Sequence, residues 1–294
     1  MTDNCLANDP LLAEELLERV LVGLGFNKRP ELTLDGLRIL YGSWCQKVPF
    51  DNVRKLIHLR AVHSGPLPGT TAADFLKGWL RFGAGGTCWA ANGAFHALLV
   101  TLGFDALRGV GTMLVATDSP PNHGTVVVNF AADQYLVDCS MLHGEPLPLR
   151  KESETSITHP AWGLRCSLRD QRWHIRWRPL HRLDGFDCRL ERFGASGDEF
   201  NESHARTRGW SPFNYEVTAR TNRGGRVIGM SFGSEISIEN DGSVRQQLIS
   251  DAERKRVLIE EIGISEELVR HLPNDIPTPP PPGSKKAQFR DLLT

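Results

Sequence analysis

The chain has 294 residues, of which 40% are hydrophobic and 23% charged, so it is long enough for one large domain or two to three packed subdomains. Its 34 basic and 35 acidic residues give a net charge of −1, and no basic patch stands out, which argues against nucleic acid as a partner. The apolar runs are too short to span a bilayer, and the first residues lack the basic and apolar regions of a secretion signal. We therefore expect a cytoplasmic protein with no membrane partner.

Apolar residues recur every three or four positions over residues 11–24, which predicts an amphipathic helix with glutamates on its outer face. Further helices are predicted at residues 34–44 and 73–81. A glycine-rich loop at residues 83–87 then breaks the pattern, and a buried helix is expected over Cys88–Leu102. The first hundred residues are thus predicted to be helical.

Beyond residue 106 the pattern changes to short β-like segments, and residues 125–130 and 135–139 are predicted to form a hairpin. The polar stretch at residues 189–209 is expected to be a long connection. The proline-rich stretch at residues 273–283 cannot be regular helix or inner strand. The remaining predicted elements are strands at residues 171–178, 215–219 and 227–232, a hairpin turn at Gly224-Gly225, and one or two helices over residues 251–272.

The cysteines are scattered, without CxxC pairs or zinc-like spacing, so we expect reduced thiols and no metal site. Five of them are expected to be small buried hydrophobic residues, and Cys88 is the candidate exception. The six are Cys5, Cys45, Cys88, Cys139, Cys166 and Cys188.

Cys88 has the surroundings that a reactive thiol needs. The preceding glycines allow a tight turn, and Thr87 can cap the helix that follows. In the first turn, free N–H groups and the positive end of the helix dipole stabilise a thiolate. The same N–H groups are candidate donors to an oxyanion. The alternative is that Cys88 is an ordinary buried residue at a helix start.

A nucleophilic cysteine also needs a base and a group that orients the base. His123 precedes the first hairpin strand and Asp138 ends the second, so the two share a face if paired positions sum to an odd number such as 261 or 263. A slip of one residue would separate them. Cys139 would face the other way, as a core thiol. Singly, these residues could be a loop histidine and a strand-end cap; together with Cys88 they predict a catalytic triad.

At these residues the chain resembles the arylamine N-acetyltransferase family. Residues 48–52 (VPFDN) match a family motif in which Asp51 stands for the usual Glu, residues 84–88 (AGGTC) match the nucleophile loop, and residues 135–138 (YLVD) follow His123 as in the family. The resemblance is specific over residues 10–145. It implies an α+β fold with a cysteine-proteinase-like core: a helical bundle at 1–104, a β-barrel domain at 105–205, and an α/β lid with a proline-rich tail at 206–294.

The resemblance also implies ping-pong chemistry. Cys88 would take an acetyl group from acetyl-CoA, a co-substrate and not a permanently bound cofactor, and an arylamine, hydrazine or N-hydroxyarylamine would then attack the thioester. The partners expected are thus an acyl-CoA donor and a small-molecule amine. The residues expected at the acceptor site are Phe50, Trp89, Gly86 and Thr87, and those at the donor site are Ser140 and Gly144.

Three departures from the family leave other functions open. Ala84 replaces an arginine, Ala90 replaces an acidic or amide residue, and the loop at residues 139–144 lacks two glycines that approach coenzyme A in the family. The alternatives are an amide synthase that uses an acyl carrier protein, a thiol hydrolase or transglutaminase-like enzyme with the same Cys-His-Asp order, and a pseudoenzyme that serves as a binding module. His143, in the altered loop, is expected to be a solvent-exposed histidine.

Overall fold

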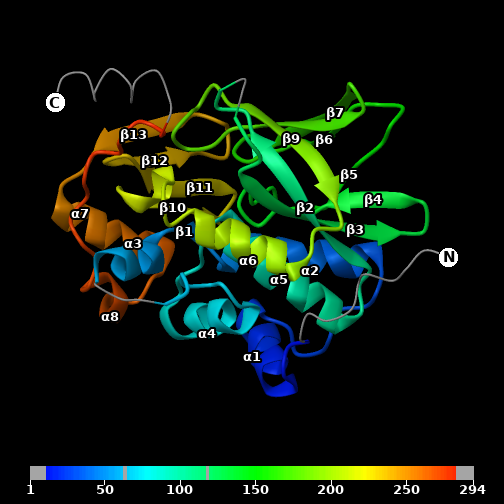
Figure 1. Cartoon of the computed structure of the whole chain (residues 1–294), viewed down its shortest axis with the longest axis horizontal. Coiled ribbons are helices and arrows are strands. Elements are labelled where there is room, and N and C mark those ends of the chain that lie inside the picture. Colours follow the sequence, from blue (N-terminus) through cyan, green and yellow to red (C-terminus); the bar gives the residue numbers. More distant parts are fainter. Residues whose placement is uncertain (1–10, 62–64, 117–118, 283–294) are drawn as a thin grey trace.

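A computed structural model describes residues 11–61, 65–116 and 119–282. Within these ranges the strands form two antiparallel sheets (Figure 1). The first, the barrel sheet, has eight strands in the order β5-β4-β3-β2-β9-β8-β7-β6. The second, the C-terminal sheet, has five in the order β1-β10-β11-β12-β13. The fold is α+β, as predicted.

The N-terminal helices lie below the two sheets in Figure 1. All four predicted helices are present, and the helix at Cys88–Leu102 has the predicted bounds. A fifth helix, α3, was not predicted because it is short and polar, with few buried side chains. The helices are α1 (Glu14–Leu24), α2 (Leu34–Lys47), α3 (Val53–Arg60), α4 (Ala72–Phe82) and α5 (Cys88–Leu102).

The predicted hairpin is confirmed as β3 and β4, whereas the prediction of a long connection at residues 189–209 is wrong. Most of that stretch belongs to β9 and to helix α6 (Gly197–Arg206). Strand β9 was not predicted because charged residues alternate with its buried side chains, which makes its average composition polar. The barrel strands are β2 (Ala106–Met113), β3 (His123–Phe130), β4 (Asp133–Leu136), β5 (Leu147–Pro148), β6 (Thr155–Ile157), β7 (Leu164–Arg169), β8 (Arg172–Trp177) and β9 (Phe186–Phe193).

The C-terminal sheet includes a strand from the N-terminal part of the chain, because β1 pairs with β10. The predicted turn at Gly224-Gly225 joins β10 to β11, and both glycines have positive φ angles. The strand expected at residues 215–219 starts later, at Thr218. The strands are β1 (Phe50–Asp51), β10 (Thr218–Arg223), β11 (Arg226–Ser231), β12 (Ser234–Ile238) and β13 (Val244–Leu248).

Most of residues 251–272 are helical, as predicted. Helix α7 (Asp251–Arg256) continues into a π-helical turn, η2 (Val257–Ile262), and α8 (Glu266–Val269) follows. Residues 273–282 have no regular secondary structure, in line with their prolines. Of the predicted domain boundaries, 104 falls between α5 and β2, whereas 205 falls within α6; the division into domains stays a prediction.

A continuous core joins the helices to the barrel sheet and positions the site. Trp44 and Phe95 pack against each other in it, with ring centroids 4.8 Å apart, and Val126 and Val128 of β3 belong to the same cluster. Helix α5 therefore packs against the strand that begins at His123. In the part of the chain that the structure describes, no helix is both long and apolar enough to cross a membrane.

Candidate active site

Cys88 is the first residue of α5, as the glycine loop predicted, and 9% of it is exposed. Its side chain belongs to a small apolar cluster with Trp89 and with Phe200 of α6. Thr87 occupies the N-cap position, but its side chain makes no capping hydrogen bond, unlike the prediction. Its carbonyl accepts from the Ala91 N–H at 2.9 Å, so the first turn of the helix is closed by backbone alone.

His123 lies between Cys88 and Asp138. It is the first residue of β3, and its Nε2 lies 2.7 Å from Oδ2 of Asp138. A side-chain hydrogen bond also links it to Cys88. Because Nε2 is held by Asp138, Nδ1 is the ring nitrogen left for the thiol. The structure therefore brings the three predicted triad residues together.

The register of the hairpin explains this arrangement. The paired positions of β3 and β4 sum to 263, as in Val127 with Leu136, which is one of the odd values that the sequence required. In this register Asp138 lies diagonally from His123 on the same face. Cys139 is turned to the other side, where it is buried in the core of the helices.

The charges of the buried pair favour an imidazolium next to a carboxylate. Burial on its own would lower the pKa of His123, but the charge and hydrogen bond of Asp138, together with the hydrogen bond to Cys88, raise it above its usual range. Burial would likewise raise the pKa of Asp138, and the interactions with His123 and Ser140 lower it instead. The imidazole is thus held in its charged form at neutral pH.

The Asp138 carboxylate is fixed by its own neighbours. Its Oδ1 accepts from the Ser140 N–H at 2.9 Å, the Ser140 hydroxyl at 2.6 Å and the Met141 N–H at 3.0 Å. The Tyr41 hydroxyl donates to its backbone carbonyl at 2.7 Å. Ser140, predicted at the donor site, therefore has its hydroxyl turned to Asp138. Gly144, the other residue predicted there, has a positive φ of 79° and lies beside Trp162.

The expectation of a solvent-exposed His143 is wrong. The side chain is fully buried; its Nδ1 donates to the Glu145 carbonyl at 2.7 Å, and its Nε2 accepts from the Asp138 N–H at 3.2 Å. Burial lowers the pKa of His143 to about 4, so the ring is neutral and can accept this hydrogen bond. The loop at residues 139–144 thus supports Asp138 with side chains where the family has glycines.

Asp51 holds the loop that precedes Cys88. Its Oδ2 accepts from the Gly85 N–H at 2.6 Å and its Oδ1 from the Val53 N–H at 2.9 Å. A Cβ atom at Gly85 would collide with the Pro49 carbonyl, so the close approach requires glycine. Burial raises the pKa of Asp51 to about 6. A single carboxylate therefore ties the nucleophile loop to the start of α3.

The two alanine departures have a structural explanation in the same loop. Ala84 is fully buried in the apolar cluster around Val53 and Leu56, so no cation is needed there. Ala90 packs so closely that a Cβ atom at Gly69 would lie 2.8 Å from its own Cβ. The Ala90 methyl group thus lies against the backbone of Gly69 and of Gly86. The loop is held by Asp51 and by small residues instead of by an arginine.

Sequence analysis missed Asn92, which connects all three parts of the site. Its Nδ2 donates to the Gly124 carbonyl at 2.7 Å, and its Oδ1 accepts from the Cys139 N–H at 2.9 Å. These two groups are next in sequence to His123 and Asp138, and Asn92 lies one helical turn after Cys88. A buried asparagine four residues after the cysteine is the signal that could have identified it.

The residues predicted at the acceptor site lie around the nucleophile loop. Phe50 forms an isolated bridge with Gly86 and packs edge-on against Phe213, with ring centroids 5.3 Å apart. Trp89 packs edge-on against Phe200 at 5.0 Å. Both aromatic residues are largely buried. Their role, and those of Gly86 and Thr87, in binding an acceptor stays a prediction.

The other cysteines within the described residues are buried free thiols, as expected, and burial raises the pKa of each. They are Cys45, Cys139, Cys166 and Cys188; Cys5 lies outside the described residues. No group of three or more potential metal ligands occurs within residues 11–61, 65–116 and 119–282.

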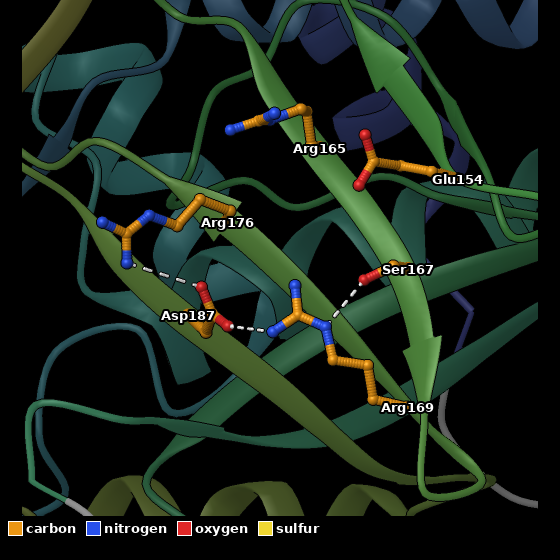
Figure 2. A pocket seen from close by; sticks show the side chains of 6 residues that line it. All are labelled: Glu154, Arg165, Ser167, Arg169, Arg176 and Asp187. Atoms are coloured by element: carbon orange, nitrogen blue, oxygen red, sulfur yellow. Dashed lines mark hydrogen bonds and ion pairs between the residues drawn. The ribbon is translucent and has the colours of Figure 1, made fainter.

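A surface pocket of about 330 Å³ lies away from the triad, on strands β7 to β9 (Figure 2). Arg169 of β7 and Arg176 of β8 point to Asp187 of β9, at 3.1 and 3.6 Å. These ion pairs connect the strands across the pocket. The lining residues are Glu154, Arg165, Ser167, Arg169, Arg176 and Asp187.

A comparison with protein families matches residues 33–269 to a family described as N-acetyltransferase. The match covers most of the chain, which makes the protein an acetyltransferase. More narrowly, the chain belongs to the arylamine N-acetyltransferase family. A comparison with curated proteins gave no match.

Solved structures of arylamine N-acetyltransferases have a similar fold. The arylamine N-acetyltransferase from Mycobacterium abscessus has a TM-score of 0.73 at 20% identity, with 87% of this chain and 92% of that chain covered. The Salmonella typhimurium enzyme has a TM-score of 0.71 at 16% identity, with 97% of this chain and 99% of that chain covered. The Mycobacterium marinum enzyme in complex with CoA has a TM-score of 0.72 at 18% identity, with 86% of this chain and 94% of that chain covered. The shared feature is the fold.

Proposed function

We propose that this acetyltransferase carries the acetyl group as a thioester on Cys88, from acetyl-CoA to an arylamine, hydrazine or N-hydroxyarylamine. The observation that carries the proposal is the buried chain of hydrogen bonds from Cys88 to His123 and from His123 Nε2 to Asp138 Oδ2, 2.7 Å away. A thiol in this position has a base beside it, and the base is oriented by a carboxylate.

In the first half-reaction the Cys88 thiolate, paired with the charged His123, attacks the carbonyl carbon of the donor thioester. A carbon–sulfur bond forms, and the carbonyl electrons move to oxygen, where N–H groups at the start of α5 are candidate donors. When the carbonyl re-forms, the bond to the CoA sulfur breaks. His123 gives its proton to the departing thiolate, which leaves an acetylated Cys88 beside a neutral imidazole.

In the second half-reaction the amine attacks the thioester on Cys88. Neutral His123 accepts one proton from the amine nitrogen through Nδ1, because Asp138 holds Nε2 as the donor. The bond between carbon and the Cys88 sulfur then breaks, the amide leaves, and the thiolate returns next to the imidazolium. Asp138 keeps the tautomer and stabilises the charged ring in both halves.

Acetyl-CoA is the donor that the family and its CoA-bound member from Mycobacterium marinum favour. The loop at residues 139–144, which carries side chains in place of glycines, supports a second candidate function. Its residues Ser140, Met141, Leu142 and His143 are buried where glycines approach the donor in the family. An amide synthase that takes its acyl group from a carrier protein is therefore the alternative.

The proposal is tested by mass spectrometry of the protein after incubation with acetyl-CoA alone. We expect one acetyl group on the peptide that contains Cys88, its rapid loss when an arylamine is added, and no label in Cys88→Ala. Loss of the acetyl group at the same rate without an amine would indicate a hydrolase. Loading only from an acyl carrier protein would favour the amide synthase, and no loading from either donor would contradict a covalent mechanism.

A further inference from the structure

Lys55, in helix α3, is a buried cation that the proposed mechanism does not use. Only 4% of it is exposed, and its Nζ donates to the Thr207 hydroxyl at 2.9 Å. Within the described residues this hydroxyl is its only hydrogen-bond acceptor, and no carboxylate there forms an ion pair with it. An ammonium has three N–H groups, so two remain available for a ligand.

Helix α6 links this cation to the reacting sulfur, because Phe200 of α6 packs in the same apolar cluster as Cys88, and Thr207, the hydrogen-bond partner of Lys55, is the C-cap residue of α6. Burial lowers the pKa of Lys55 to about 8, Cys88 raises it, and Arg208 lowers it. Of the interactions that act on Lys55, the one with Cys88 thus favours the ammonium form. His204, which also interacts with Lys55, is neutral, because burial lowers its pKa to about 4. The surroundings of Lys55 are therefore basic, and in the proposed mechanism the Cys88 thiolate is its counter-charge.

Acylation of Cys88 removes that counter-charge. A thioester is neutral, so during the second half-reaction the Lys55 ammonium is buried without an anionic partner among the described residues. A buried charge is costly unless it is paired and hydrogen-bonded. A substrate that carries its own anion next to the reacting carbon would satisfy both requirements.

We propose that Lys55 is a specificity residue that binds a carboxylate of the substrate beside Cys88, carried either by the acceptor amine or by the acyl group of the donor. This inference rests on the proposed function. A carboxylate fits better than a phosphate of coenzyme A, because the phosphates are separated from the reacting sulfur by the whole pantetheine arm. The carboxylate oxygens would accept the two free N–H groups of Lys55.

Two matched substrate pairs separate the two sources of the carboxylate. In the acceptor arm, 4-aminobenzoate is compared with 4-aminobenzamide, with acetyl-CoA as donor. In the donor arm, succinyl-CoA is compared with butyryl-CoA, with 4-aminobenzamide as acceptor. The quantity measured in each arm is the ratio of kcat/KM for the charged substrate to that for its neutral match.

We expect wild type to prefer the carboxylate in one arm, and Lys55→Met to lower that ratio about 10- to 100-fold, the effect of one hydrogen bond to a charged group. Lys55→Arg, which keeps the charge, should retain most of the preference. Lys77→Met, which removes an exposed lysine of α4, should leave both ratios unchanged.

The inference is overturned if wild type prefers the carboxylate in neither arm, a result that does not depend on how any variant folds. It is also overturned if a folded Lys55→Met keeps both ratios. In either case, turnover of 4-aminobenzamide with acetyl-CoA leaves the proposed function intact. If wild type neither turns over the neutral pair nor forms an acetylated Cys88, the proposed function itself fails.

Discussion

Replacing Asp138 with asparagine changes one oxygen atom to an NH2 group, and we expect it to lower kcat about 10⁴-fold. Oδ1 of Asp138 accepts three hydrogen bonds from Ser140 and Met141, so the amide oxygen should take that place. The NH2 group would then face Nε2 of His123. Nε2 must then accept a hydrogen bond from this NH2 group, so the ring proton moves to Nδ1, the nitrogen that faces Cys88.

The size of the effect follows from this wrong tautomer. A ring with its proton on Nδ1 cannot take a proton from the attacking amine, and it has lost the carboxylate that raises the pKa of His123. The same exchange in a Ser-His-Asp triad lowers kcat about 10⁴-fold, which corresponds to ~5.5 kcal/mol of transition-state stabilisation. Binding of the substrates should change little by comparison.

The assay is the rate of CoA thiol release at saturating acetyl-CoA and arylamine, measured across pH. Asp133→Asn, an exposed change in strand β4, is the matched control and should retain wild-type kcat. Thermal unfolding checks that both variants are folded. A folded Asp138→Asn with kcat within about 10-fold of wild type would refute the assigned role of the carboxylate.

Three further changes test how the site is held. Asn92→Leu leaves two buried backbone groups unpaired and should lower the free energy of unfolding by ~2–4 kcal/mol, as measured by urea denaturation. Gly85→Ala should cost ~2–3 kcal/mol and most of the activity, because its new methyl group collides with backbone, whereas Gly209→Ala should be nearly neutral. Burial raises the pKa of Asp51 to about 6, above its ordinary value, so its protonated form favours folding and that stability is lost as the pH rises through 6. Relative to Asp51→Asn, wild type should thus lose up to ~3 kcal/mol between pH 4 and 7.

Each of these results could go the other way. An Asn92→Leu variant as stable and active as wild type would mean that α5 is positioned by apolar packing alone. Equal effects of Gly85→Ala and Gly209→Ala would contradict the close approach to Pro49. Parallel stability curves for wild type and Asp51→Asn between pH 4 and 7 would show that this carboxyl does not titrate in the folded protein.

Periodicity was enough to predict the helices that bury an apolar face. The sequence left the register of the hairpin open, and the structure has the paired sum of 263 that brings His123 and Asp138 to one side. Periodicity failed at β9, where arginines and glutamates alternate with the buried residues, so that the average polarity is that of a loop. It failed also at α3, whose eight residues bury only three side chains. Both failures come from elements stabilised by tertiary contacts more than by their own composition.

The supporting residues of the site could not be predicted because their partners are distant in sequence. His143 is buried by the helices below the loop, where its ring lies 4.9 Å from that of Tyr41. Asn92 connects α5 to strand β3 and to the turn after β4, and a helix pattern alone does not show which groups such a side chain contacts. Cys88, by contrast, was predictable from its local sequence, since the glycine loop and the helix start are both local features.

The account depends most on the claim that His123 keeps Cys88 ionised. The direct measurement is the rate of iodoacetamide alkylation of Cys88 as a function of pH, followed by peptide mass spectrometry, in wild type and in His123→Gln. We expect Cys88 to be alkylated much faster in wild type than in the variant, while the buried Cys139, whose pKa is raised by burial, reacts slowly in both. Equal rates at Cys88 in the two proteins would contradict the account.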